Sequence, residues 1–318
     1  MGVNQSEQPV RIKFLPGAHE VDALPGETIL QTALRAGISL THACGSNARC
    51  STCRTAILEG LENCSPRTEA EEEIAEHLQF KPMIRLACQT SLTGNAVVRR
   101  LVLDDEDEEL AADSMSDNLV EAAGEERQVA ILFADIRGFT SFAERLLPYD
   151  VIHALNRYYY RMGRIVHRHG GVVDNYMGDG ILSVFGLEGT EQVVSRALQC
   201  GLEMLKAVEA MKPYFEAVHG RSFDIGLGLH YGAVVVGSIG WGVSKRRTIV
   251  GDAVNFASRV ESANKNAGTS FLISEAAYDQ AGHEIEVNQC PPWEIRGKSG
   301  MFQLFEVVGS RSNSTGLT

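Results

Sequence analysis

The chain has 318 residues, of which 44% are hydrophobic, and its formal net charge at pH 7 is -12. This length suffices for two ordinary domains, and the negative charge argues against a polyanion such as DNA as the main partner. The start, MGVNQSEQPV, lacks the apolar region of a signal peptide, and no apolar run approaches the ~18–20 residues of a membrane span. We therefore expect a cytoplasmic protein without a membrane span, whose seven cysteines are reduced thiols or metal ligands.

Residues 1–103 show the pattern of a small mixed α+β domain. RIKFLPGAHEVDAL predicts two strands joined by a Pro-Gly turn, and GETILQTALRAG predicts a short helix that Gly37 closes. Further along, TAILEG, IRLACQT and NAVVRRLVL predict strands, and EAEEEIAEHL predicts a helix.

The composition changes sharply at residue 104. Residues 104–126 are acidic and poor in aromatic side chains, which predicts an exposed linker, in part helical, that could transmit a signal. This linker separates the first domain from a second domain at 127–309, and the polar tail 310–318 is expected to be disordered.

The second domain has the pattern of an α/β sandwich. VAILFA is a continuous apolar run, typical of a strand that is covered on both faces. The remaining predictions, in chain order, are an amphipathic helix at 150–168, two strands in GGVVDNYMGDGILSVFG with Gly178, Asp179 and Gly180 at the hairpin tip, a long helix at 191–216, a pair of strands in FDIGLGLHYGAVVVGSIG, and a helix in DAVNFASRVESANKN with Asp252 as its N-cap.

Four cysteines of the first domain are candidate ligands. Cys44, Cys50 and Cys53 have the spacing C-x5-C-x2-C, and Cys88 lies further along in RLACQT. An iron–sulfur cluster needs four converging thiolates, and the small residues of the loop would let the backbone approach the sulfides. A structural zinc site and buried free thiols are the alternatives, although only one C-x2-C pair is present, whereas zinc knuckles usually have a second pair.

Residues 8–103 resemble a [2Fe–2S] ferredoxin. The resemblance covers the strand–strand–helix start, the cysteine loop and the distant fourth cysteine, and the gap of five residues matches the adrenodoxin-like branch. It implies a β-grasp fold, a [2Fe–2S] cluster held by Cys44, Cys50, Cys53 and Cys88, and a partner such as a ferredoxin reductase or another electron donor.

Two aspartates of the second domain are candidate metal ligands. Asp135 ends the apolar strand, and Asp179 lies at the hairpin tip, so the two carboxylates meet if the strands are neighbours. Such a pair suits Mg²⁺ or Mn²⁺, and the N–H groups of IRGFTSF, which follows Asp135, could hold phosphates. The alternatives are an N-cap role for Asp135 and a turn role for Asp179.

FADIRGFTSFAE, YMGDGILSVFG and TIVGDAVNFASRVE resemble the catalytic domain of class III nucleotide cyclases over residues 127–309. The resemblance implies an α+β fold with a ferredoxin-like βαββαβ core and two Mg²⁺ or Mn²⁺ ions per active site. The resemblance also implies that the metal ligands are Asp135, Asp179 and the backbone carbonyl of Ile136.

The same resemblance assigns the nucleotide contacts. It implies that Asn255 aligns the ribose and that Arg259, four residues later on the same helix face, stabilises the transition state. Lys298 would contact the terminal phosphates, with an ordinary solvated lysine as the alternative. The phosphates would also lie on the turn formed by three residues, Gly138, Phe139 and Thr140. The family builds each site across a homodimer, with the aspartates from one chain and the Asn and Arg from the other.

Base selectivity departs from the family's usual pairs. Asn175 and Arg246 stand at the positions that we assign to base reading. Asn175 can donate and accept, so it suits adenine, whereas Arg246 only donates and suits a carbonyl of guanine or a pyrimidine. ATP is favoured on family prevalence, GTP is the rival substrate, and a pyrimidine nucleotide stays open.

These features predict a redox-sensing adenylate cyclase whose output depends on an N-terminal [2Fe–2S] cluster. One alternative is an electron-transfer ferredoxin whose cyclase-like half is a non-catalytic dimerisation or nucleotide-binding module. Another is a zinc-bearing interaction module fused to a cyclase.

Overall fold

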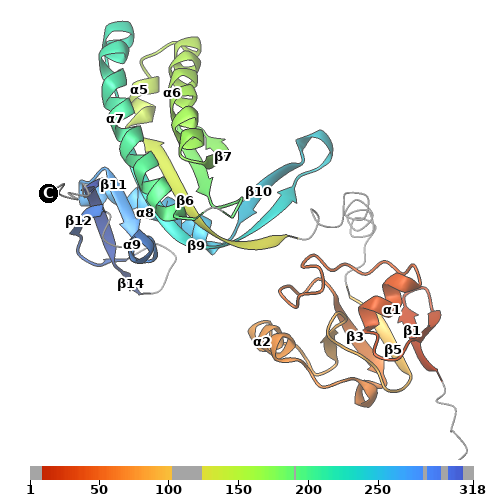
Figure 1. The fold of residues 1–318 in the computed structure, drawn as a ribbon. Helices are drawn as coiled ribbons and strands as arrows, with labels where there is room; N and C mark the ends of the chain where they lie inside the picture. The colour runs from red at the N-terminus through yellow and green to blue at the C-terminus, as the bar shows by residue number, and fades with distance from the viewer. Residues whose placement is uncertain (1–8, 102–123, 190, 282–284, 295–299, 311–318) are drawn as a thin grey trace, which may run out of the picture. The chain divides into compact units, whose positions relative to one another are not determined.

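The computed structural model describes residues 9–101, 124–189, 191–281, 285–294 and 300–310, and it divides into two compact units (Figure 1). The first unit consists of the residues up to Glu125 together with Gly237–Arg246, and the second consists of Glu126–Val236 and the residues from Arg247 on. Most of the acidic linker, Lys298 and the tail after residue 310 lie outside the described residues. No helix in the described ranges combines the length and apolarity that crossing a membrane requires.

The first unit is a five-stranded mixed sheet with the strand order β2-β1-β5-β3-β4. β1 pairs antiparallel with β2 and parallel with β5, and β3 pairs antiparallel with β5 and β4. Its elements are β1 (Val10–Leu15), β2 (His19–Ala23), α1 (Ile29–Arg35), β3 (Arg54–Glu59), η1 (Leu61–Asn63), α2 (Glu69–His77), β4 (Ile84–Leu86) and β5 (Ala96–Arg100).

α1 begins where the sequence provides a capping box. Thr28 accepts a hydrogen bond from the backbone N–H of Gln31, and the Gln31 side chain accepts one from the Thr28 N–H. The helix buries Ile29 and Leu30 against Ile12 and other residues of the first core. The predicted strands and helices of this unit are confirmed, although β4 ends at Leu86, before Cys88.

The second unit is built on an eight-stranded sheet with the order β12-β15-β11-β9-β6-β8-β7, in which β10 pairs with β9 outside this path. Its elements are β6 (Glu125–Ile136), α5 (Phe139–Ala143), α6 (Pro148–Arg168), β7 (Gly171–Met177), β8 (Gly180–Phe185), α7 (Val193–His219), β9 (Ile225–Ile239), η2 (Gly242–Ser244), β10 (Arg246–Val250), α8 (Asp252–Ala267), β11 (Phe271–Ser274), α9 (Glu275–Ala281), β12 (Ile285–Gln289), β13 (Trp293–Glu294), β14 (Met301–Phe302) and β15 (Leu304–Ser310). The series β6, α6, β7, β8, α7, β9 is the expected βαββαβ core.

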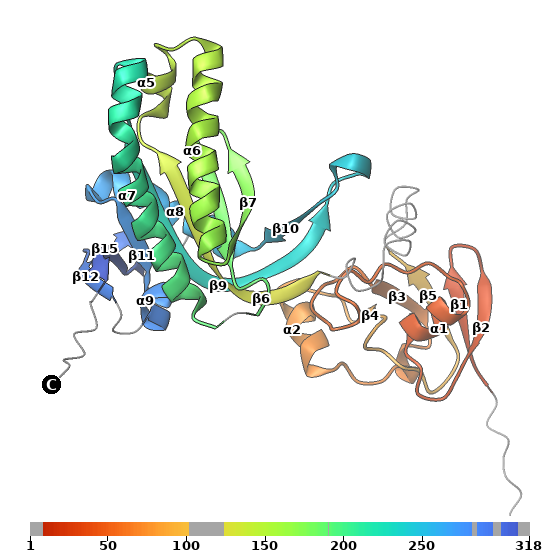
Figure 2. The ribbon, with the colours of Figure 1, turned by 45° about the horizontal axis from the view of Figure 1, so that its top comes forward.

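β6 lies in the centre of this sheet because both of its faces are apolar. Ala130 and Leu132 pack into the core beneath α6 and α7, whereas Val129 and Ile131 pack on the other face with Ala257 of α8. This alternation follows from the two-residue period of a strand. Figures 1 and 2 show α6 and α7 side by side over one face of the sheet.

Two local predictions are wrong. Residues 225–239 form one continuous strand, β9, instead of a pair of strands. Its glycines are sites of close packing, since a Cβ added to Gly226 would lie 2.4 Å from the Glu261 carboxylate and one on Gly228 would lie 2.2 Å from the Glu261 backbone nitrogen. Asp252 is the first residue of α8, and Gly251 occupies the N-cap position.

Candidate cluster-binding and catalytic sites

The four predicted cluster cysteines lie as two pairs. The Sγ atoms of Cys53 and Cys88 are 3.4 Å apart, and Cys44 shares a side-chain hydrogen bond with Cys50. The shared proton lowers the pKa of Cys88 to about 6, against the effect of burial, and raises the pKa of Cys53. Two thiol pairs match a cluster in which each of two irons takes two thiolates.

The loop that carries these thiols is shaped to approach an inorganic core. Gly45, Ser46 and Ala48 all have left-handed backbone conformations, with φ of 63°, 71° and 50°. The turns direct backbone N–H groups at the sulfurs, among them the N–H of Ala48 at Cys88. Within the described ranges, no three His, Cys, Asp or Glu side chains converge on a single metal position. The two thiol pairs, with backbone N–H groups directed at their sulfurs, fit a [2Fe–2S] cluster.

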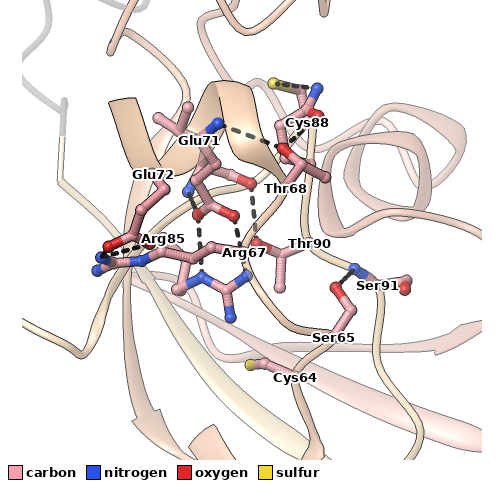
Figure 3. Close-up of polar contacts among 12 residues, drawn as sticks. Cys64, Ser65, Arg67, Thr68, Glu71, Glu72, Arg85, Cys88, Thr90 and Ser91 are labelled. Atoms are coloured by element: carbon pink, nitrogen blue, oxygen red, sulfur yellow. Dashed lines mark hydrogen bonds and ion pairs between the residues drawn. The ribbon is translucent and has the colours of Figure 1, made fainter. Parts of the chain in front are cut away.

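A buried ion pair fixes the segment that leads to Cys88 (Figure 3). Both oxygens of Glu71 accept hydrogen bonds of 2.9 Å from the Arg85 guanidinium, and one oxygen also accepts from the Leu86 N–H at 2.7 Å. Glu71 is fully buried and Arg85 is 4% exposed. The Thr90 hydroxyl donates to the Leu86 carbonyl at 3.0 Å, so both backbone groups of Leu86 are held two residues before Cys88.

This pair is not evident from the sequence, because Glu71 is one of several glutamates in EAEEEIAEHL. Only its helix face distinguishes it from Glu72, which is exposed and pairs with Arg67 at 3.3 Å.

Asp135 and Asp179 lie together, as the sequence predicts. β6 and β8 are antiparallel, and their register pairs Ala134 with Ile181, which places Asp135 opposite Gly180. A Cβ on Gly180 would lie 3.3 Å from the Asp135 carboxylate, so glycine leaves room for that carboxylate. The Tyr159 hydroxyl of α6 donates to the carbonyl of Gly178 and anchors the tip that carries Asp179.

The electrostatics of the aspartate pair suit a divalent cation. Burial and the nearby charge of Asp179 raise the pKa of Asp135 to about 6, and burial raises the pKa of Asp179. Neither carboxylate has an ion-pair partner among the described residues. Two partly buried carboxylates without a cation are costly, and a bound Mg²⁺ or Mn²⁺ relieves that cost, so these residues fit the expected metals.

A cavity of about 300 Å³ opens beside Asp135. Gly138 lines it, as expected for a nucleotide contact, while Phe139 stacks on Phe142 with ring centroids 6.3 Å apart and Thr140 is exposed. The full lining is Asp135, Ile136, Arg137, Gly138, Glu261, Ser262 and Lys265.

Glu261 lines this cavity and was not predicted as a site residue from the sequence. Burial and the charge of Asp135 raise the pKa of Glu261 to about 7, and the Arg137 guanidinium partly opposes that shift. The side chain reaches the cavity because Gly226 and Gly228 on β9 let α8 approach. The signal was present as alternating glycines in IGLGLH, which lie within the predicted pair of strands and can mark a close approach of another element.

Asn255 and Arg259 share one face of α8, but they do not line the described part of this cavity. Each helical residue turns by about 100°, so Arg259 and Glu261 point roughly 200° apart. Glu261 faces the Asp135 cavity of its own chain, and Arg259 therefore faces away from it.

The two expected base-reading residues lie on adjoining elements. Asn175 is half-buried on β7, beside a register shift at Asp174, and Arg246 is the exposed first residue of β10. The contact between these elements is a hydrogen bond of 2.7 Å from the Thr248 hydroxyl to Asp174. Thr248 is buried and was not singled out from the sequence.

Comparisons with known proteins agree with this geometry. Residues 121–306 match the model of the adenylate and guanylate cyclase catalytic domain, and residues 13–93 match that of the 2Fe-2S iron-sulfur cluster binding domain.

Similar proteins include an adenylate cyclase of Anabaena cylindrica, 34% identical over 60% of this chain and 39% of that protein. Adenylate cyclase 1 of Rhizobium meliloti is 30% identical over 58% of this chain and 28% of that protein. The chain thus spans less than two fifths of the length of these relatives.

Two solved structures have the fold of the second unit. The guanylyl cyclase Cya2 is 32% identical with a TM-score of 0.56, covering 61% of this chain and 98% of that one. The adenylyl cyclase CyaB from P. aeruginosa is 29% identical with a TM-score of 0.55, covering 59% and 97%.

Proposed function

This chain belongs to the adenylate and guanylate cyclase family, and from that premise we propose that it converts ATP to 3′,5′-cyclic AMP and pyrophosphate under control of a [2Fe–2S] cluster. The main support for the proposed cyclase reaction is that Asp135 and Asp179 lie together at one edge of the sheet, next to a cavity. The two thiol pairs support the proposed control by a [2Fe–2S] cluster.

The proposed reaction joins the ribose 3′ oxygen to the α-phosphorus, releases the 3′-hydroxyl proton to water, and breaks the bond from that phosphorus to the oxygen that leaves with pyrophosphate. Two Mg²⁺ or Mn²⁺ ions held by Asp135, Asp179 and the Ile136 carbonyl would supply positive charge to the attacking and leaving oxygens. Asn255 orients the ribose, and Arg259 meets the negative charge that grows on the phosphoryl oxygens. Gly138, at the cavity, lets the backbone approach the phosphates.

A homodimer is part of the proposal because one chain does not bring the two halves of the site together. Glu261 faces the Asp135 cavity of its own chain, so Arg259 faces away from it. A second copy is needed to present Asn255 and Arg259 to the aspartates.

The contact at Thr248 supports adenine as the base. Because the Thr248 hydroxyl donates its proton to Asp174, its oxygen can only accept from a ligand. Adenine has a donating amino group at the ring position where guanine has a carbonyl oxygen, so such an acceptor favours adenine there, and Asn175 has an amide oxygen as well. Guanine is the second candidate, because Arg246 at the start of β10 offers donors for a carbonyl.

Redox control would require an electron donor. A plant-type cluster has a potential near -400 mV, below the roughly -220 to -320 mV of cytosolic glutathione, so the cluster would rest oxidised without a dedicated reductase. The exposed face of α2 carries Glu69, Glu72, Glu73 and Glu76, which suits a partner with a basic surface.

The proposed redox control of the cyclase rate is tested anaerobically on the full chain. The cyclase rate is measured with the cluster oxidised, after dithionite reduction, and in a Cys50→Ser variant. We expect the first two rates to differ by ~5-fold or more, a typical allosteric coupling. Equal rates, with both cluster states confirmed by absorbance, would reduce the cluster to a structural role.

A further inference from the structure

Almost all of the chain's net negative charge lies in one short segment. Residues 104–126 contain eleven of the 41 Asp and Glu and none of the 29 Lys and Arg, so the rest of the chain has 30 acidic residues against 29 basic ones. Six of the eleven are consecutive, at positions 104–109. Such a run repels itself and gains from contact with a basic surface.

A basic groove lies between α6 and α7, which run side by side in both views (Figures 1 and 2). It holds a cavity of about 350 Å³ whose apolar lining comes from Ile165, Ala207 and Ala210. The charged residues that line the groove are Arg161, Arg164, Arg168, Lys206 and Glu203. Glu203, its one carboxylate among the described residues, is already paired with Arg168 and His169.

The groove is basic because of a repeating pattern in α6. Arginines at 157, 161, 164 and 168 have spacings of four, three and four residues, which places them along one side of the helix. Arg157 lies 3.7 Å from the centre of the Tyr214 ring. Within the described part of the chain, Arg161 and Lys206 have no ion-pair partner.

The acidic segment can reach this groove. β6 enters the second unit next to the first turn of α7, since a Cβ on Gly186 would lie 3.0 Å from Val193 and 3.6 Å from the Gln128 carbonyl. Glu203 is ten residues further along α7, about 15 Å by helical rise. The strand residues from Glu125 to Gln128 add about 10 Å to this path. Residues 110–124 can span up to about 50 Å when extended, about twice the resulting ~25 Å.

We propose that the basic groove of α6 and α7 is the docking site for residues 104–109 of the same chain. Charge complementarity favours this occupant, because six consecutive carboxylates meet three arginines and a lysine. The covalent connection favours it further, since a short tether makes the binding intramolecular and raises the effective concentration. The acidic face of α2 has fewer negative charges than residues 104–109. Its binding to the groove in place of residues 104–109 is the alternative result that the test distinguishes.

The experiment uses the full chain and a carbodiimide, which joins a carboxylate to a neighbouring lysine Nζ as an amide. Lys206 is the lysine of the groove, so its cross-linked peptides identify what docks there. Lys212, 2.6 Å from Glu209 and 2.7 Å from Asp224, provides an internal reference for the reagent. Mixing ¹⁴N and ¹⁵N chains distinguishes links within a chain from links between chains.

We expect Lys206 to be joined to residues 104–109 in peptides of a single isotope. The Arg161→Gln/Arg164→Gln variant keeps both reacting groups and should lower this yield about threefold or more relative to the Lys212 link, as should ~1 M salt. A matched Arg145→Gln/Arg247→Gln variant, which changes two exposed arginines outside the groove, should leave the yield unchanged.

Three results would overturn the proposal. They are cross-links from Lys206 to the glutamates of α2, cross-links from Lys206 to residues 104–109 of a differently labelled chain, and a cross-link yield that is the same in wild type and in the Arg161→Gln/Arg164→Gln variant. The readout needs no cyclase activity, so its failure is distinguishable from failure of the proposed catalytic function.

Discussion

The buried pair of Glu71 and Arg85 allows a quantitative prediction about the cluster-binding unit. Replacing Glu71 by Ala leaves the guanidinium of Arg85 without its partner in a site where it is only 4% exposed. Breaking a buried ion pair from one side costs ~3–5 kcal/mol, and the Leu86 N–H also loses its acceptor. We therefore expect the unfolding free energy of this unit to fall by about 3–5 kcal/mol.

The same change should loosen the cluster, because Leu86 leads directly to Cys88. Urea unfolding of the full chain, followed by visible absorbance of the cluster, reports on this unit alone. Glu72→Ala on the same helix is the matched control, and since Glu72 is exposed we expect it to cost less than ~1 kcal/mol. Replacing both partners, as Glu71→Leu/Arg85→Met, should be less harmful than Glu71→Ala. Our interpretation is refuted if the unfolding free energy of Glu71→Ala lies within ~1 kcal/mol of the wild-type value and the variant keeps a full cluster.

Three further predictions concern the catalytic unit. Mixing inactive Asp135→Ala with inactive Arg259→Ala should restore cyclase activity, since one site of each mixed dimer is intact; no recovery despite proven subunit exchange would contradict shared sites. Glu261 has its pKa raised from 4.5 to about 7, so folding takes up a proton and stability should decline as pH rises from 4.5 to 7. Thermal unfolding of the metal-free Glu261→Gln variant should show a weaker decline of stability with rising pH. A pH profile equal to that of wild type would contradict the assignment of this decline to the Glu261 carboxylate. Thr248→Ala should lower the preference for ATP over GTP in competition assays, and an unaltered ratio would remove Thr248 from base reading.

The sequence predicted those features that depend on local periodicity. The apolar run at 129–134 predicted β6, and the glycines around Asp179 predicted the hairpin tip. The meeting of Asp135 and Asp179 was predicted only on condition that their strands were neighbours, and the antiparallel register of β6 and β8 meets that condition.

The features that the sequence did not predict depend on tertiary packing. The segment with the glycines of β9 was predicted as two strands, yet it is one strand in which Gly226 and Gly228 lie against Glu261 of α8. The same packing brings Glu261 into the cavity. Glu71 and Thr248 likewise look ordinary in the sequence, because their importance comes from partners 14 and 74 residues away.

The most direct test of the central claim is product analysis. The purified 318-residue chain is incubated with ATP, GTP, CTP and UTP separately in the presence of Mn²⁺, and the nucleotide products are identified by mass spectrometry. We predict 3′,5′-cyclic AMP with release of pyrophosphate, formed fastest from ATP and abolished in Asp179→Ala. A cyclic product formed mainly from another nucleotide would change the substrate. No cyclic product from any of the four, with both units folded and the cluster present, would contradict the assignment as a cyclase.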